Sequence, residues 1–148
     1  WQHAIRWVQE YYGEFECFVS LPTTSPLRIL EDVRACISAL DAETDLVITM
    51  TETNRSPWFN MLNCSKNGYV RLLLDGNRNY VCRQEVPKAY DMTTIAYVSR
   101  PSFVLKCNGI WDGNVRGVFV PQERSIDIDT LFDFKIAEFL ISERHNKE

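Results

Sequence analysis

Two aspartates on one short segment are the residues of this sequence best suited to bind a metal ion. Asp127 and Asp129 alternate with isoleucines within residues 125–130. On an extended backbone the two carboxylates lie on one face, while the isoleucines anchor the other face in the core. Adjacent negative charges are costly unless a cation neutralises them, and their oxygens suit Mg²⁺ with bound substrate phosphates. The segment is therefore a candidate divalent-cation site.

A local structural role competes for the same segment. Thr130 and Asp133 fit a capping box at the start of a closing helix, and Asp129 fits the turn that precedes this helix. We expect both roles to hold, because a capping box formed by Thr130 and Asp133 leaves Asp127 and Asp129 free.

The loop LPTTSPLR, residues 21–28, is a second candidate, because it follows a predicted strand and precedes a predicted helix. Its three hydroxyls and Arg28 suit a carboxylate or polyol ligand. Ligands of open α/β sheets bind at such carboxyl ends of strands, next to helix N-termini. In the alternative interpretation, Ser25 caps the helix and Pro26 occupies its first turn, which requires no ligand. The residues alone leave both interpretations open.

Arg83 and Gln84 form a third and weaker candidate within the polar stretch 75–90. An arginine in a mobile loop can close over a phosphate or carboxylate, although most such arginines are simply solvated. His3 and His145 lie near opposite ends of the chain, which gives no support to a histidine-centred mechanism. The sequence also contains no GxSxG, Walker or GxGxxG motif, so it does not indicate a hydrolase, a P-loop enzyme or a Rossmann dehydrogenase.

The elements that must position these residues predict a three-layer α/β/α fold with a mostly parallel sheet. Helical spacing of apolar residues predicts helices over 1–12, 27–40 and 131–143, the second with a stripe of Leu30, Val33, Ile37 and Leu40. Short apolar runs predict strands at 16–21, 45–50, 94–99 and 115–121. The strand-helix-strand unit through residue 50 predicts parallel strands with a right-handed crossover. Two β-prone runs, 58–62 and 69–74, flank an Asn67-Gly68 turn and predict a protruding hairpin.

Composition limits the class of protein. The 148 residues are 45% hydrophobic and 24% charged, which is typical of one ordinary domain. A net charge of −4 disfavours nucleic-acid binding, which requires a basic surface. Five dispersed cysteines without a CxxC pair predict reduced thiols and a cytoplasmic location. No apolar stretch approaches the about 18 residues of a membrane span, and no signal peptide is recognisable, so we expect no membrane association.

Three stretches, LPTTSPLR, RQEVPKAYDMTTIAYV and ERSIDIDTLFDFKIAEFL, resemble in this order the acylneuraminate cytidylyltransferase (CMP-sialic acid synthetase) family. Enzymes of this family activate a nine-carbon 2-keto acid with CTP and release pyrophosphate. The resemblance covers nearly the whole chain. It implies a nucleotide-diphospho-sugar transferase-like fold, Mg²⁺ as a cofactor, CTP and a nonulosonic acid as substrates, and a homodimer.

The resemblance also implies roles for individual residues. Asp127 and Asp129 would hold the divalent cation and act in catalysis together with Arg83. The residues implied in substrate binding are Pro22, Thr23, Thr24, Ser25, Arg83, Gln84 and Tyr97. Within a single partial domain over 1–148, the hairpin at 57–75 resembles the dimerisation element of the family.

The sequence departs from the family pattern in three places. Leu21 stands where the family typically has Gln, and Thr93-Thr94 stands where it has Asn-Gly, so the acceptor is expected to be another nonulosonic or keto-deoxy sugar acid. The family's N-terminal strand and the basic, glycine-containing loop that cradles CTP are missing, so we expect the chain to start within the domain and to be inactive alone. The alternative is a noncatalytic oligomerisation or sugar-acid-binding module derived from this fold.

Overall fold

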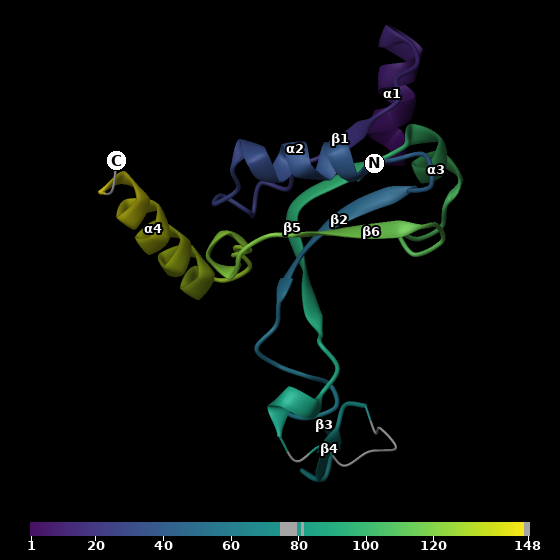
Figure 1. Cartoon of the computed structure of the whole chain (residues 1–148). Coiled ribbons are helices and arrows are strands. Elements are labelled where there is room, and N and C mark those ends of the chain that lie inside the picture. The colour runs from purple at the N-terminus through teal and green to yellow at the C-terminus, as the bar shows by residue number, and fades with distance from the viewer. Residues whose placement is uncertain (75–79, 81, 147–148) are drawn as a thin grey trace. The chain divides into compact units, whose positions relative to one another are not determined.

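The computed structural model describes residues 1–74, 80 and 82–146, which form two compact units. The first unit comprises Trp1–Thr51 and Met92–Glu148, and the second comprises Glu52–Asp91. Their helices and strands are α1 (Gln2–Tyr12), β1 (Phe18–Ser20), α2 (Leu30–Ala39), β2 (Leu46–Glu52), β3 (Leu62–Cys64), β4 (Val70–Leu72), η1 (Arg83–Glu85), β5 (Tyr90–Ser99), α3 (Pro101–Lys106), β6 (Val115–Phe119), η2 (Gln122–Arg124) and α4 (Leu131–His145). Figure 1 labels the α-helices and the strands.

The three predicted helices are confirmed as α1, α2 and α4. Helix α1 ends at Tyr12, where Gly13 adopts a φ of 89° that glycine reaches without penalty. Helix α4 begins with the predicted capping box, because the Asp133 amide donates to the Thr130 hydroxyl and the Thr130 amide to the Asp133 carboxylate. The short helix α3 was not predicted; Pro101 starts it, a residue that suits the first turn.

The sheet of the first unit has the strand order β1-β5-β2-β6, and it confirms the α/β class. Strand β6 runs parallel to β2, whereas β1 runs antiparallel to β5. Strand β5 is also antiparallel to β2, since Arg100 bonds to Asp45 at one end of the pair and Thr49 bonds to Thr93 further along. The sheet is therefore mixed: β1 and β2 are parallel as predicted, but β5 lies between them.

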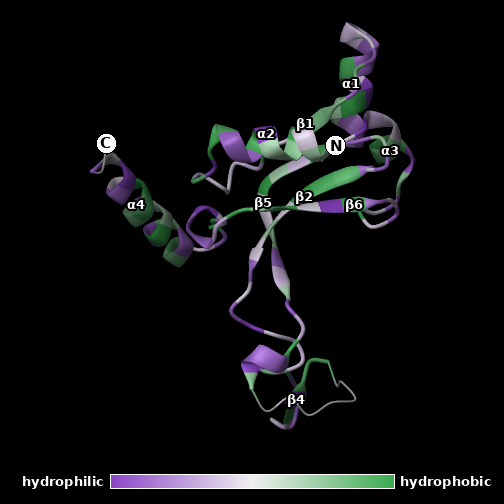
Figure 2. Cartoon of the chain, viewed as in Figure 1, coloured by the Kyte–Doolittle hydropathy of each residue, from purple (hydrophilic) through white to green (hydrophobic). Residues whose placement is uncertain are grey.

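The core lies between α2 and the centre of the sheet. Cys36 of α2 packs there against Val47 of β2 and against Ala96 and Val98 of β5, and all four are fully buried. Figure 2 shows the hydrophobic character of β2 beneath α2. Burial, and next the charge of Asp32, raise the pKa of the Cys36 thiol to about 11. Cys36 is thus a buried, neutral packing residue.

The apolar stripe predicted for α2 is wrong in part. Leu30 is 56% and Ile37 45% exposed, whereas Asp32 and Cys36 are the buried residues of the helix. Asp32 and Cys36 are four positions apart and share one helix face. The helix is rotated from the predicted orientation, because the Asp32 carboxylate is paired in the interior.

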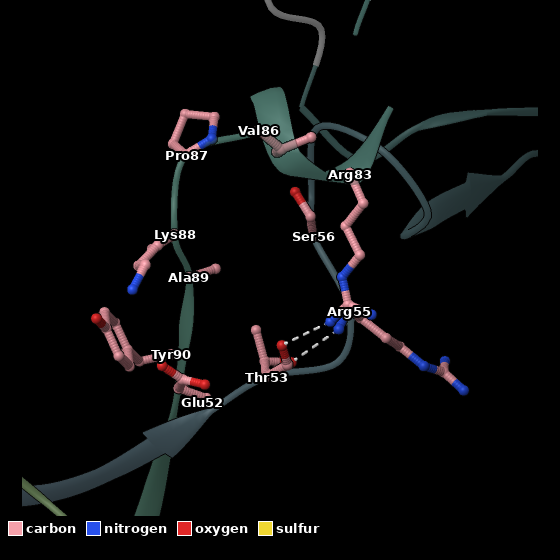
Figure 3. A pocket seen from close by; sticks show the side chains of 10 residues that line it. All are labelled: Glu52, Thr53, Arg55, Ser56, Arg83, Val86, Pro87, Lys88, Ala89 and Tyr90. Carbon is pink, nitrogen blue, oxygen red and sulfur yellow. Dashed lines mark hydrogen bonds between the residues drawn. The ribbon is translucent and has the colours of Figure 1, made fainter. Parts of the chain in front are cut away.

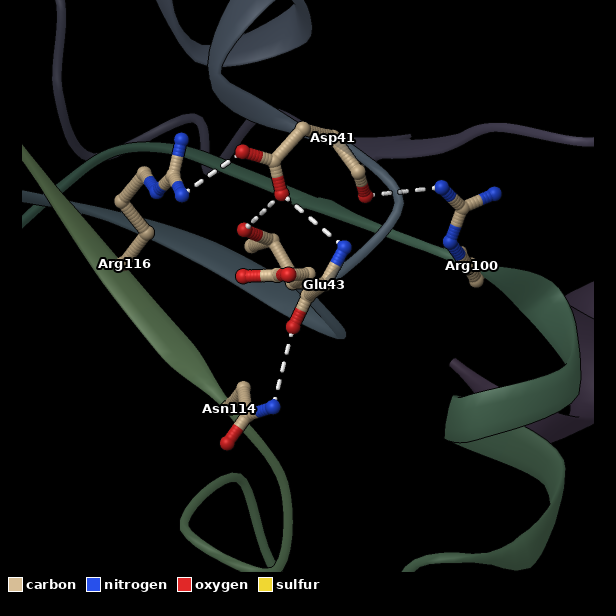
Figure 4. A network of polar contacts seen from close by, with 6 residues as sticks. Asp41, Glu43, Arg100, Asn114 and Arg116 are labelled. Atoms are coloured by element: carbon tan, nitrogen blue, oxygen red, sulfur yellow. Dashed lines mark hydrogen bonds and ion pairs between the residues drawn. The ribbon is translucent and has the colours of Figure 1, made fainter.

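A polar network joins the loop between α2 and β2 to β6 and to the start of α3 (Figure 4). The Asp41 carboxylate accepts hydrogen bonds from the Thr44 hydroxyl at 2.7 Å and the Glu43 amide at 3.1 Å. It also pairs with Arg116 of β6 at 2.7 Å, and Arg100 donates to the Asp41 carbonyl at 2.8 Å. The Thr44 hydroxyl above all, with the Glu43 amide and Arg116, lowers the pKa of Asp41. This network ties together the segments that lead into β2, β6 and α3.

The second unit contains the hairpin of β3 and β4, which pair antiparallel with Leu62 opposite Leu72. Gly68 takes a φ of 83° in the connecting turn, as the Asn67-Gly68 pair predicted. The first strand lies later than predicted, because the Ser56 carbonyl accepts from the amides of residues 59–61 and folds this stretch into a turn. The predicted polar loop at 75–90 lies partly outside the described residues.

Two findings concern compartment and membrane. The cysteines Cys17, Cys36, Cys64, Cys82 and Cys107 are all free thiols. Among the helices of the described ranges, none is long and apolar enough to cross a bilayer.

The core predicts the effect of shortening Val47. Val47→Ala removes two methyl groups from a fully buried position and is expected to lower the free energy of unfolding by about 2 kcal/mol. Urea unfolding followed by tryptophan fluorescence measures the change. The control is Leu131→Ala, at a position of α4 that is 72% exposed, with an expected change below about 0.5 kcal/mol. Equal losses in both variants would contradict the placement of Val47 in the core.

Candidate active site

Residues 21–28, the site loop, connect β1 to α2 and are folded back on themselves. Arg28 donates from Nε to the Ser25 carbonyl at 3.0 Å and from Nη2 to the Pro22 carbonyl. Burial lowers the pKa of the Arg28 guanidinium. The Leu27 side chain, within the same loop, is fully buried. Sequence reasoning considered Arg28 as an anion ligand. In the structure it also holds the site loop in its folded-back conformation through these two carbonyls.

Ser25 does not cap the following helix, so the purely local interpretation of the site loop is wrong. Helix α2 begins at Leu30 with Ile29 as its N-cap residue, and the Ile29 amide donates to the Asp32 carboxylate at 3.1 Å. Ser25 is instead 99% buried, and its hydroxyl lies 2.6 Å from the Thr94 hydroxyl of β5. The site loop is therefore attached to the strand at the centre of the sheet.

Residues 125–130, the acidic segment, meet the site loop through the backbone. The Ile128 amide donates to the Thr24 carbonyl at 2.9 Å. The segment is irregular rather than a strand, and the two aspartates differ in exposure: Asp127 is half-buried and Asp129 is exposed. Asp127 Oδ1 is buried and has no hydrogen-bond partner within the part of the chain that the structure describes.

Tyr97 of β5 lies near Asp127 and completes this group. Burial, and next the charge of Asp127, raise the pKa of the Tyr97 phenol above its usual 10.0. The Trp1 ring packs against the Tyr97 ring with centroids 5.1 Å apart. In the sheet, Tyr97 is paired with Ser20, the last residue of β1 before the site loop. The structure therefore brings together three sequence-predicted parts: the site loop, Tyr97 and the acidic segment.

Two threonines of β2, Thr49 and Thr51, add hydroxyl groups that sequence reasoning did not single out, and Thr49 bonds to Thr93, which it had noted as a departure from the family pattern. The Thr93 hydroxyl donates to the Thr49 hydroxyl at 2.7 Å, and the Thr49 hydroxyl donates to the Thr93 carbonyl at 3.1 Å. The Thr51 hydroxyl is buried and has no partner among the described residues. The alternation of threonine with apolar residues in 46–51 is the signal that could have indicated Thr49 and Thr51.

Arg83 and Gln84 belong to the second unit, where both side chains are exposed in η1. Arg83 donates to the Thr53 carbonyl at 3.3 Å and to Asn54 Oδ1 at 3.5 Å. It borders a cavity of about 210 Å³ that Lys88 also lines, as Figure 3 shows. These two basic residues suit an anionic ligand, but the contacts that join the site loop, Tyr97 and Asp127 do not include Arg83 or Gln84.

The acidic segment fits a divalent cation with a small protein ligand set. Among the described residues, no group of three or more His, Cys, Asp or Glu side chains could enclose a metal ion. Mg²⁺ usually retains several waters and binds one or two carboxylates together with substrate phosphates. The unpartnered Oδ1 of Asp127 and the exposed Asp129 carboxylate match that requirement.

Burial of Tyr97 and the nearby charge of Asp127 predict an unusual titration of its phenol. The pKa of the Tyr97 phenol is higher in the folded protein than in the unfolded chain, so at a pH below the unfolded-state pKa the neutral phenol contributes fully to stability. This contribution is lost as the pH rises through the folded-state pKa. Asp127→Asn removes one cause of the shift, so the pKa of Tyr97 moves part of the way toward 10.0. Ultraviolet absorbance of tyrosinate measures it, with Tyr97→Phe identifying the signal. Asp129→Asn is the control, and equal shifts in both aspartate variants would contradict this geometry.

Comparison with known proteins gives two curated relatives. The chain is 31% identical over 140 residues to the post-translational flagellin modification protein B of Campylobacter coli, which covers 93% of the chain and 58% of that protein. It is 36% identical over 97 residues to the CMP-N,N'-diacetyllegionaminic acid synthase of Campylobacter jejuni, covering 65% of the chain and 40% of that protein. The chain therefore spans about half the length of these relatives.

A solved structure shares the fold. The crystal structure of 4-diphosphocytidyl-2C-methyl-D-erythritol synthase from Anaerococcus prevotii matches with a TM-score of 0.62 and 15% identity, over 94% of this chain and 62% of that one. No protein-family model matches the chain. The two curated relatives, together with this fold, confirm the resemblance to the acylneuraminate cytidylyltransferase family over the part of those relatives that the chain spans.

Proposed function

We propose that the chain is part of a cytidylyltransferase that joins CMP from CTP to a sialic-acid-like 2-keto sugar acid and releases pyrophosphate. The observation that carries this proposal is the junction of the site loop with the acidic segment: Ile128 bonds to Thr24, and the buried Asp127 Oδ1 beside it lacks a partner. A loop that suits a sugar acid, next to a carboxylate available to a divalent cation, would supply two parts of a nucleotidyl-transfer site. The relatives support the same chemistry.

The site loop and β5 are proposed to bind the sugar acid. Residues 22–25 supply hydroxyl groups and backbone amides for a carboxylate and a polyol, and Tyr97 supplies a phenol beside them. Thr94 is bonded to the buried Ser25, so this pair of hydroxyls would hold the site loop in place beside the ligand. The named activity of the C. jejuni relative favours a legionaminic-acid-like nonulosonic acid as the acceptor.

Asp127 and Asp129 are proposed as the ligands of a divalent cation, with Mg²⁺ the best match for their oxygens. When bound, such a cation neutralises charge on the phosphate oxygens during transfer. Asp127 is held in place by the backbone bond of its neighbour Ile128, whereas the exposed Asp129 is free to meet an incoming nucleotide. Arg83 and Gln84 are proposed to bind an anionic substrate group within the second unit, where Arg83 and Lys88 border one cavity.

The proposed metal role predicts the effect of removing one charge. Asp129→Asn keeps the side-chain shape and is expected to lower kcat at least about 100-fold with little change in thermal stability, because the interaction lost is one made in the transition state. The assay is pyrophosphate release from CTP and a nonulosonic acid, in the longest natural polypeptide that contains this sequence. Glu138→Gln, on an exposed position of α4, removes the same charge as a control.

The outcomes of this assay separate the two candidate functions. Normal turnover by the Asp129→Asn variant would contradict the assigned metal ligands. Binding of the sugar acid without any pyrophosphate release from the unmodified protein would favour the noncatalytic module instead.

The hairpin of the second unit is proposed to mediate a homodimer. Leu62 is 57%, Val70 55% and Leu72 38% exposed on a two-stranded ribbon, which has little stability of its own. A second copy of the ribbon would cover these side chains by two-fold symmetry.

Light scattering tests the dimer, with an expected mass of about twice 17.3 kDa. Leu62→Asp places a charge in the exposed apolar face and is expected to shift the mass to that of a monomer. Asn63→Asp adds the same charge one residue along, where the side chain points to the other face of the strand, and should leave the dimer intact. A monomer in the unmodified protein would contradict the proposed dimer.

A further inference from the structure

Arg124 and Asp32 join two segments that lie 92 residues apart in the sequence. Arg124 donates from Nε to Asp32 Oδ2 at 3.0 Å and from Nη2 to Oδ1 at 2.7 Å. The pair is shielded from solvent, since the two side chains are 21% and 5% exposed. A planar guanidinium that binds both carboxylate oxygens restricts direction as well as distance. The pair therefore sets how the two segments are oriented.

Each partner lies next to a part of the candidate site. Asp32 is in the first turn of α2, the helix that directly follows the site loop. Arg124 is the last residue of η2, and the acidic segment with Asp127 comes immediately after it. A change in the angle between Asp32 and Arg124 would therefore displace the acidic segment relative to the site loop.

The bond from the Ile128 amide to the Thr24 carbonyl reports directly on this arrangement. It joins the acidic segment to the site loop at 2.9 Å and involves backbone atoms alone. Backbone bonds of irregular segments open easily unless neighbouring contacts hold the two chains in place. The Arg124 guanidinium is such a contact, on the other side of Asp127 in the sequence.

We propose that Arg124, held by Asp32, is a positioning residue of the candidate site, fixing the acidic segment against the site loop before any ligand binds. The proposal rests on the proposed function in that Asp127 is taken as a cation ligand. Such positioning preorganises the site. A carboxylate that is already fixed loses less conformational entropy when the cation binds, so the cation binds more tightly.

Amide hydrogen exchange measures the positioning without any ligand. Arg124→Lys keeps the charge but loses the two-pronged contact, and Arg124→Gln loses the charge as well. Both variants lose a hydrogen bond from Arg124 to the charged Asp32 carboxylate. We therefore expect the amide hydrogen of Ile128 to exchange at least about tenfold faster in both. The Val120 amide, which donates to Met50 at 2.8 Å, should exchange at an unchanged rate.

Arg116→Lys is the control for the loss of an arginine-aspartate pair. It disturbs a pair of the same 2.7 Å length, between Arg116 of β6 and Asp41, whose side chains are more exposed, at 46% and 45%. A purely structural role for Arg124 would accelerate the Ile128 and Val120 amides together, as global destabilisation does. Selective acceleration at Ile128, absent in Arg116→Lys, supports positioning.

Binding of Mn²⁺, detected by electron paramagnetic resonance, measures the consequence for the site. Arg124→Lys is expected to weaken Mn²⁺ binding about tenfold, as residues that orient metal ligands do. Arg116→Lys should leave the affinity unchanged, and Asp127→Asn should abolish binding.

The outcomes distinguish this proposal from the proposed function. An unchanged Ile128 exchange rate in both Arg124 variants overturns the positioning role by itself. So does Mn²⁺ affinity that is unaffected by Arg124→Lys but abolished by Asp127→Asn, a result that leaves the metal site intact. Mn²⁺ binding that is undetectable, or indifferent to Asp127→Asn, overturns the metal site and with it the role of Arg124.

Discussion

A buried carboxylate is stable only when it is paired and fully hydrogen-bonded, and this constraint on Asp32 organises the rest of the first unit. Asp32 is 4% exposed, and its carboxylate accepts hydrogen bonds from the Ile29 amide and from two N–H groups of Arg124. The first bond sets where α2 begins and therefore where the site loop ends. The other two set where the chain lies after β6. One charged group thus defines the borders of both segments that meet at the candidate site.

The sheet explains why those segments are neighbours at all. Strands β1, β2 and β6 run in the same direction, so the site loop after β1 and η2 after β6 both follow carboxyl ends, where open α/β sheets bind ligands. Strand β5 runs the other way between β1 and β2, and it contributes Thr94 and Tyr97 at that same end. The Thr94 hydroxyl of β5 thereby bonds to the buried Ser25 hydroxyl, which fixes the site loop to the sheet.

Local patterns were sufficient to predict most of the elements and to single out the site loop and the acidic segment, which the structure joins. Helical spacing identified α1, α2 and α4, and the Thr130–Asp133 capping box left Asp127 and Asp129 outside the last helix. Order along the chain could not predict that β5 inserts into the strand-helix-strand unit, because strand neighbours depend on long-range pairing. Nor could the order predict that Ser25 bonds to Thr94, because a serine just before a helix can either cap that helix or bond to a distant strand.

The orientation of α2 shows most clearly why the remainder was not predictable. Hydrophobic spacing favours burying Leu30 and Ile37, yet the helix buries Asp32 and Cys36 instead. Exposing two aliphatic side chains costs a few kcal/mol at most, whereas an unpaired buried carboxylate costs more, so Arg124 must be present before this rotation is favourable. Because that partner is 92 residues away, no window around α2 contains the information.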